Sequence, residues 1–270
     1  MSAKDTNPTK KVKKPSKKTA TSLQASNAHV GLVKNDAYLE PYEDAIRGRH
    51  DHYLWKLNQL TGNGRKLLTD FANGHEYYGL HKLSKGWVFR EWAPNATEIY
   101  LVGDFNGWQE TERYRATRIE GTGNWELRLS EKAITHGDLY KMHVYWNGGR
   151  GERIPAWVRR VVQDEQTGIF SAQVWQPEHA YEWSKKKFKP NTSPLLIYEC
   201  HIGMGQDAEK VGSYTEFKEL VLPRIIDDGY NCIQIMAIQE HPYYGSFGYH
   251  VSSFFAASSR FGTPEELKSL

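Results

Sequence analysis

The chain has 270 residues, of which 39% are apolar and 13% aromatic, enough for one large or two medium-sized folded domains. Residues 1–20 contain seven Lys and one Asp and so carry +6, which leaves −3 for the rest of a chain whose formal net charge is +3. The nearly neutral remainder argues against a nucleic-acid-binding fold, and no apolar run is long enough to span a membrane.

The N-terminal tail, residues 1–27, is dominated by lysine ("KKVKKPSKK") and is expected to be disordered. It lacks the apolar stretch of a secretory signal peptide. The two cysteines, Cys200 and Cys232, lie in apolar runs, which is typical of reduced core cysteines and not of a disulfide or metal site. We therefore expect a cytoplasmic protein without a bound metal.

Residues 28–75 are expected to form a helical segment. In "LEPYEDAIRGRHDHYLWKL" the spacing of Ile46, Arg49, Tyr53 and Leu57 fits one or two amphipathic helices. A second, shorter helical stretch, "RKLLTDFANG", follows it.

Residues 76–184 are expected to form an antiparallel β-sandwich. Short aromatic and β-branched runs recur at roughly ten-residue intervals, separated by Gly, Asn and Pro. The stretch "GNWELRL" alternates, with Trp125, Leu127 and Leu129 on one face, which predicts that Trp125 belongs to the core. The stretch "WNGGRGE" is typical of a hairpin turn.

A polar, Pro-bounded linker at 185–194 precedes the last predicted unit, residues 195–270. Within this unit, "LLIYECHIG" and "NCIQIMAIQEHP" are expected to be buried strands. The stretch between them predicts a helix that begins with a capping box formed by Ser213 and Glu216. The order strand, helix, strand is typical of a parallel sheet.

The apolar spacing also predicts how these helices pack. The buried side of the helix after Ser213 is expected to consist of Phe217, Leu220, Val221, Ile225 and Ile226. A further helix is expected to start after Thr263, which suits an N-cap, with Pro264 at the first helical position.

Several of these stretches resemble a known family. "EWAP", "LVGDFNGW" and "GNWEL" resemble the starch-binding, immunoglobulin-like sandwich found beside α-amylase-type barrels. "LLIYECHIGM" and "YNCIQIMAIQEHPYYGSFGYHVSSFFAASSRFGTPEELKSL" resemble the start of the catalytic barrel of glycogen branching enzymes. The resemblance covers residues 30–270. It implies a multidomain fold: a helical segment, an antiparallel sandwich, and the first βαβ of an incomplete (β/α)₈ TIM barrel.

The resemblance implies a 1,4-alpha-glucan branching enzyme, which cuts an α-1,4 linkage and transfers the chain to a 6-hydroxyl with retention. Retention requires a carboxylate nucleophile and an acid/base roughly 5 Å apart. The family places both beyond Leu270, so we expect this chain alone to be inactive. Glu199 and Glu240, on the two predicted strands, are interpreted as structural. The expected partner is an α-1,4-glucan, the expected state is a monomer, and no cofactor is implied.

The resemblance also implies glucan-binding residues in the sandwich. Trp108, which follows "GDFNG", is the strongest candidate for a ring that stacks on a sugar. The other implied residues are Trp92, Ala93, Pro94, Gly123, Asn124 and Lys141. The alternatives are that Trp108 packs in a hairpin, that Trp92 belongs to a core strand, and that Lys141 is an ordinary exposed strand lysine.

In the barrel segment, "YYGSFGYHV" places Tyr249 where α-amylase-type enzymes keep a tyrosine that stacks on the sugar next to the scissile bond. Tyr244 and His250 are expected to line the same groove, with packing roles as the alternative. The hydrolases of this superfamily have an Asp near the position of Ser246, which counts against a calcium-dependent amylase.

Three other functions remain open from the sequence. The first is a glucan-binding module without catalysis. The second is a debranching or amylolytic hydrolase, against which "EHPYYGSFGYHVSSFFAASSRFG" argues. The third is nucleic-acid binding through the lysine tail, which predicts an affinity that falls steeply with salt.

Overall fold

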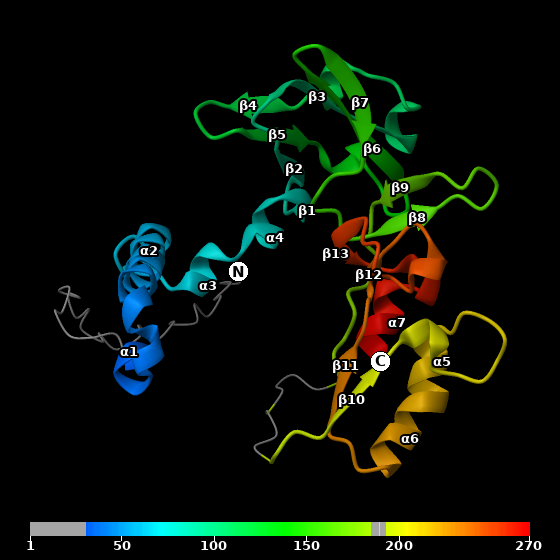
Figure 1. Ribbon diagram of the computed structural model, residues 1–270. Coiled ribbons are helices and arrows are strands. Elements are labelled where there is room, and N and C mark those ends of the chain that lie inside the picture. Colours follow the sequence, from blue (N-terminus) through cyan, green and yellow to red (C-terminus); the bar gives the residue numbers. More distant parts are fainter. Residues whose placement is uncertain (1–30, 185–188, 190–192) are drawn as a thin grey trace, which may run out of the picture. The chain divides into compact units, whose positions relative to one another are not determined.

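The computed structural model describes residues 31–184, 189 and 193–270 (Figure 1). The chain divides into two units, one ending at Asn73 and one running from Gly74 to Leu270. The predicted tail lies outside the described residues, as does most of the predicted linker. No helix in the described part of the chain is both long and apolar enough to cross a membrane.

The first unit is helical, as predicted from the 3.6-residue spacing. Its elements are α1 (Gly31–Asn35), a 3₁₀ turn (Ala37–Tyr42), α2 (Glu43–Thr61) and α3 (Leu68–Phe71). Asp36 caps the 3₁₀ turn by accepting a hydrogen bond from the backbone of Tyr38 at 3.0 Å. The long helix α2 ends at Gly62, whose φ of 60° is the left-handed conformation that favours glycine at a helix end.

The second unit begins with α4 (Gly74–Tyr77) and continues as two antiparallel sheets. The first sheet has the order β1-β2-β5-β4, with bounds Gly79–Leu83, Gly86–Trp92, Asn124–Leu129 and Thr117–Ile119. The second has the order β3-β6-β9-β8, with bounds Ala96–Gly103, Leu139–Trp146, Phe170–Gln173 and Val161–Gln163. A further strand, β7 (Gly149–Arg153), pairs with β6 through the predicted hairpin.

The two sheets share one hydrophobic core, which confirms the predicted antiparallel architecture. Trp125, Leu127 and Leu129 of β5 are 4–7% exposed and pack with the fully buried Ile99 and Leu101 of β3. Trp125 also donates a hydrogen bond from its indole nitrogen to the carbonyl of Ala93, at 3.0 Å. The side chain of Trp125 is therefore structural, as the alternation predicts.

The βαβ arrangement is present after residue 194. Strands β10 (Ile197–Cys200) and β11 (Cys232–Ile235) pair in parallel, with Ile197 opposite Cys232. The predicted capping box is formed: the backbone of Glu216 donates to Ser213 Oγ at 3.1 Å, and the backbone of Ser213 donates to Glu216 Oε2 at 3.0 Å. The helical connection comprises α5 (Tyr214–Glu216), a π-helical turn (Phe217–Val221) and α6 (Leu222–Asp227).

The predicted buried side of this helix is wrong at two positions. Phe217 and Ile225 are 1% and 3% exposed, but Leu220 and Ile226 are 53% and 59% exposed. A π-helical turn closes its hydrogen bonds from i to i+5, so the face that starts at Phe217 continues at Leu222 instead of Leu220. Burial was also overestimated at Ile197, which is 48% exposed, because β10 pairs only with β11 in the described residues.

The last elements are β12 (Gln239–Glu240), β13 (Ser253–Ala257) and α7 (Pro264–Ser269), and they contact the sandwich (Figure 1). Arg160 donates to the carbonyl of Gly262 at 3.1 Å. The indole nitrogen of Trp175 donates to Glu265 Oε2 at 2.8 Å. Thr263 caps α7 as predicted, accepting from the backbone of Glu266 at 3.3 Å.

Candidate functional site

Five of the predicted glucan-binding residues lie together at one end of the first sheet. Trp92 is the last residue of β2 and lies opposite Asn124, the first residue of β5. The backbone of Ala93 donates to the carbonyl of Gly123 at 2.9 Å, which joins the end of β2 to the turn before β5. Trp92 is 58% exposed, so it is not the core residue of the alternative interpretation.

Gly123 allows the side chains of Trp92 and Pro94 to approach the turn before β5 closely. Its φ is 74°, in the left-handed region that favours glycine. A Cβ at this position would lie 3.0 Å from the Cβ of Pro94 and 3.1 Å from the indole nitrogen of Trp92. Both rings therefore approach a backbone that carries no side chain.

The cluster is supported from one side by two further rings. Asn124 Oδ1 accepts a hydrogen bond from the Tyr78 hydroxyl at 2.9 Å. The Tyr78 ring stacks on Trp157, with centroids 5.4 Å apart and 22° between the planes. Arg118 donates to the carbonyl of Pro94 at 2.9 Å. The result is an exposed indole held beside an amide and backbone carbonyls, a combination of apolar face and hydrogen-bonding groups that suits a sugar ring.

Sequence reasoning missed Glu91, the buried neighbour of Trp92. This carboxylate is 4% exposed and accepts hydrogen bonds from the backbone of Trp92 at 3.0 Å and of Ala156 at 2.9 Å. Burial raises the pKa of Glu91, although the two backbone donors act in the opposite direction. The available signal was a single acidic residue within a strand that is otherwise rich in apolar residues.

Trp108 and Lys141 do not belong to this cluster: Trp108 lies in the turn that follows β3, and Lys141 lies on β6 of the second sheet. Trp108 has a φ of 62° and donates from its indole nitrogen to Asp104 Oδ1 at 3.0 Å. Lys141 on β6 is 8% exposed and pairs with Glu152 on β7, so it is not an ordinary exposed lysine. The hydrogen bond from Lys141 lowers the pKa of Glu152.

A polar network that sequence reasoning also missed lies beside the pair of Lys141 and Glu152. Glu110 accepts from His143 Nδ1 at 2.7 Å and from the Tyr145 hydroxyl at 2.9 Å. Arg150 donates to the same Tyr145 hydroxyl at 3.1 Å. The outer face of β6 and β7 is therefore lined by charged and hydroxyl groups that already have partners.

The three residues predicted in the barrel segment lie in and next to the loop after β12. Tyr249 is 66% exposed, and its hydroxyl is 3.5 Å from the sulfur of Met236. Tyr244 is half-buried, with its hydroxyl 2.7 Å from where a Cβ of Gly203 would lie. His250 is exposed. Of the three, Tyr249 offers the most accessible ring.

The two carboxylates on the strands have different surroundings. Glu240 is fully buried and accepts from the backbones of His241 and Ser259, at 3.2 and 2.7 Å. Glu199 accepts from the side chain of Gln234 at 3.3 Å. The loop-bonding role predicted for Glu240 is confirmed by these contacts.

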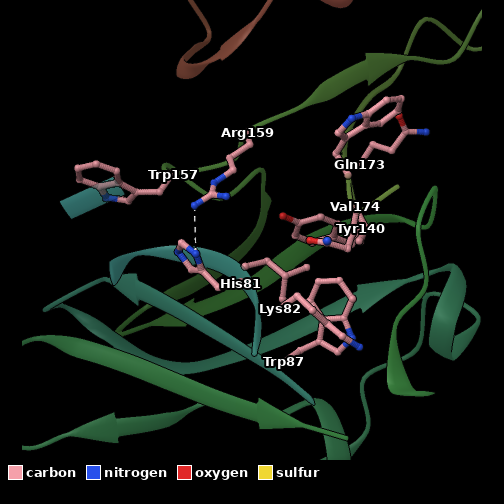
Figure 2. Close-up of a pocket in the computed structure, with 11 residues that line it drawn as sticks. His81, Lys82, Trp87, Tyr140, Trp157, Arg159, Gln173 and Val174 are labelled. Atoms are coloured by element: carbon pink, nitrogen blue, oxygen red, sulfur yellow. Dashed lines mark hydrogen bonds between the residues drawn. The ribbon is translucent and has the colours of Figure 1, made fainter. Parts of the chain in front are cut away.

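A cavity of about 110 Å³ opens between the two sheets, beside β1 and the end of β9 (Figure 2). Arg159 Nη2 donates to His81 Nδ1 at 3.1 Å, so the proton of His81 is on Nε2, which donates to the carbonyl of Tyr78 at 2.7 Å. Burial lowers the pKa of His81, which keeps this ring neutral. Tyr140, 3% exposed, also lines the cavity, and burial raises the pKa of its hydroxyl.

No cluster of three or more metal-binding side chains occurs among residues 31–184, 189 and 193–270.

Comparison with known proteins identifies what this arrangement is similar to. Residues 77–160 match the family described as carbohydrate-binding module 48 (isoamylase N-terminal domain). The 1,4-alpha-glucan-branching enzyme of Dictyostelium discoideum is 41% identical over 88% of this chain and 36% of its own length. The enzyme of the same name from Saccharomyces cerevisiae is 40% identical over 89% of this chain and 37% of its own length. The chain therefore spans little more than a third of the length of these curated relatives.

Solved structures share the fold at low identity. A type I pullulanase from Bacillus subtilis, complexed with maltose, superposes with a TM-score of 0.57 at 19% identity, covering 70% of this chain and 30% of the pullulanase. A mutant pullulanase from Paenibacillus barengoltzii, complexed with maltotetraose, gives 0.55 at 19% identity, covering 70% and 33%. These likenesses concern the fold and carry no conclusion about activity.

Proposed function

We propose that this chain is the N-terminal part of a 1,4-alpha-glucan-branching enzyme. Residues 77–160 match the carbohydrate-binding module 48 family, and most of the chain is similar to enzymes of that name. In this proposal the sandwich binds an α-1,4-glucan, and the βαβ from β10 onward is the start of a catalytic TIM barrel. A cytoplasmic location and a monomeric state remain predictions.

The observation that carries glucan binding is the exposed Trp92 held against Pro94 and Gly123. A flat apolar ring flanked by the Asn124 amide and backbone carbonyl oxygens suits the apolar face of a pyranose and its hydroxyls. A stacked ring of this kind contributes roughly 1–3 kcal/mol to binding other flat ligands. Trp108, in the turn after β3, is proposed as a second platform, and Lys141 on β6 as a further contact.

The two platforms can be tested separately. We expect Trp92→Ala and Trp108→Ala each to weaken binding of maltoheptaose by about 1–3 kcal/mol in isothermal titration calorimetry. Trp183→Ala serves as a matched control, because this tryptophan is 60% exposed but follows the sandwich strands. Retained affinity in both platform variants would exclude the proposed surface.

For catalysis, we propose that the nucleophile and the acid/base are supplied by other parts of the full-length enzyme. Glu240 is unsuitable because it is fully buried and bonded to backbone donors. Tyr249 is proposed to stack on the sugar beside the scissile bond, with Tyr244 and His250 lining the groove. In the full-length enzyme, Tyr249→Ala is expected to lower branching turnover more than Tyr243→Ala, a change at a neighbour that is 65% exposed. Equal turnover in the two variants would show that Tyr249 does not lie in the groove.

A glucan-binding module without catalysis is the alternative. The same calorimetry would detect binding in either case. Only a branching assay on the full-length protein, scoring new α-1,6 branch points against released reducing ends, separates chain transfer from binding alone and from hydrolysis.

A further inference from the structure

Glu91 joins two segments of the sandwich that are far apart in the sequence. One carboxylate oxygen accepts from the backbone of Trp92 at 3.0 Å, and the other accepts from the backbone of Ala156 at 2.9 Å. Ala156 lies between β7 and β8, 65 residues away. The two oxygens therefore hold the end of β2 against a connection on the other side of the core.

These bonds complete a closed ring of contacts around the candidate glucan surface. Ala156 precedes Trp157, whose indole stacks on Tyr78. Tyr78 in turn donates its hydroxyl to Asn124, which lies opposite Trp92 in the sheet. Trp92 is thus held from one side by Glu91 and from the other by its strand neighbour Asn124.

We propose that Glu91 is a positioning residue for glucan binding: its carboxylate fixes the backbone of Trp92 relative to Trp157, so that the indole is held ready for the sugar. This inference rests on the proposed function of Trp92. Preorganisation of this kind improves affinity, because a ring that is already fixed in the free protein loses little conformational entropy when the sugar binds.

The chemistry of the site requires a carboxylate. Two N–H groups point at the two oxygens, so both oxygens must accept. A glutamine has one acceptor and would turn its NH₂ group toward the second N–H. A protonated carboxyl is a weaker partner for the two N–H groups, because its hydroxyl oxygen accepts less strongly than a carboxylate oxygen and adds a donor that needs an acceptor of its own. Burying the Glu91 carboxylate costs desolvation free energy, and in the described residues only backbone N–H groups offset that cost. A buried charge without an ion-pair partner adds little stability, which favours a positioning role.

The two phenols that interact with the charge of Glu91 do not titrate at acid or neutral pH. The phenols of Tyr78 and Tyr140 are both affected by its charge, and the pKa of each is raised, so both stay neutral at acid and neutral pH. Beyond them, burial lowers the pKa of His81, and Arg159 donates a hydrogen bond to that ring. Burial raises the pKa of Glu91, so its carboxylate becomes protonated at a higher pH than an ordinary glutamate, and glucan binding is expected to weaken as the pH falls through that raised pKa.

The test uses the 270-residue chain and maltoheptaose in calorimetry at several pH values. Glu91→Gln is expected to bind roughly five- to tenfold more weakly than wild type at neutral pH. Its affinity is expected to lack the fall seen in the wild type on acidification, because the variant has no carboxyl group at this position. Glu126→Gln is the matched control: it lies on the neighbouring strand, pairs with Arg90, and should retain the wild-type affinity and pH profile.

The outcomes separate this inference from the proposed function. Loss of binding in Trp92→Ala with full binding in Glu91→Gln would overturn the role of Glu91 and leave the glucan surface standing. Full binding in Trp92→Ala would remove the surface itself. If Glu91→Gln does not fold, Glu91→Asp decides: it keeps the charge but reaches less far, so weaker binding with the pH dependence retained is expected, and wild-type affinity at every pH would overturn the proposal.

Discussion

The indole of Trp157 and the phenyl ring of Phe255 stack face to face, with centroids 4.0 Å apart and 13° between their planes. Trp157 belongs to the sandwich and Phe255 to β13, so the stack joins two regions with different predicted roles. Tyr78 also stacks on Trp157, so contacts among three rings connect the candidate glucan surface with the strand that follows the Tyr249 loop.

Removing the Phe255 ring from these contacts should loosen the attachment of β13. We expect Phe255→Ala to lower the free energy of unfolding by about 1–2 kcal/mol, since a stacked aromatic pair contributes beyond the area that it buries. Phe254→Ala is the control, because this neighbour on the same strand is 71% exposed, against 47% for Phe255. Urea unfolding measures both, and equal losses would mean that the stack contributes nothing of its own.

A side chain at Gly123 should obstruct the candidate glucan surface. Gly123→Ala strains the backbone, because alanine disfavours a φ of 74°, and it places a methyl group against Pro94 and Trp92. We expect this variant to lose about 2–3 kcal/mol of stability and to bind maltoheptaose more weakly. Gly121→Ala separates the two effects. Its φ of 72° imposes a similar backbone cost of about 1 kcal/mol, but nothing lies within 4 Å of the added methyl. Equal affinities in the two variants would count against the surface.

The pair of Lys141 and Glu152 should make stability depend on pH. The hydrogen bond from Lys141 holds the folded-state pKa of Glu152 below 4.5, so the carboxylate stabilises the fold above its unfolded pKa. That contribution disappears as the pH falls through the lowered folded-state value. Glu152→Gln should therefore reduce the urea midpoint at pH 7, with a difference from wild type that narrows below pH 4.5. A difference that stays constant across this range would contradict the pairing.

The cap of α7 should control the stability of that helix. Thr263→Ala removes the acceptor of the Glu266 N–H, and we expect a loss of about 1 kcal/mol. Thr263→Ser keeps a hydroxyl at the same position and should retain most of the stability. Amide hydrogen exchange at Glu266 and Leu267 reports the change locally, and unaltered exchange in the alanine variant would show that the cap is not used.

Features set by neighbouring residues were predictable. The alternation of β5 requires only a two-residue period, and the capping boxes at Ser213 and Thr263 require only a hydroxyl and a glutamate three residues apart. Each is decided within one turn or one strand, so the rest of the fold has little opportunity to change it.

Features set by backbone irregularities or by distant partners were not predictable. One π-helical turn was enough to move Leu220 out of the predicted apolar face. Of the seven residues implied for the sandwich, five cluster around Trp92 at the end of the first sheet, whereas Trp108 lies in the turn after β3 and Lys141 on β6 of the second sheet. Nothing in the sequence indicates that Glu91 would meet Ala156, since no local pattern encodes a contact across 65 residues.

The sequence by itself determined the helical start, the antiparallel strands, the helix caps and the family resemblance, because periodicity, capping and short motifs depend on residues close together in the chain. Only the tertiary structure decided that Trp92 is exposed, that Lys141 is buried against Glu152, and that Glu91 ties the glucan surface to the Trp157–Phe255 stack. Those outcomes depend on which strands become neighbours, and strand pairing brings together side chains whose separation in the sequence carries no information about their contact.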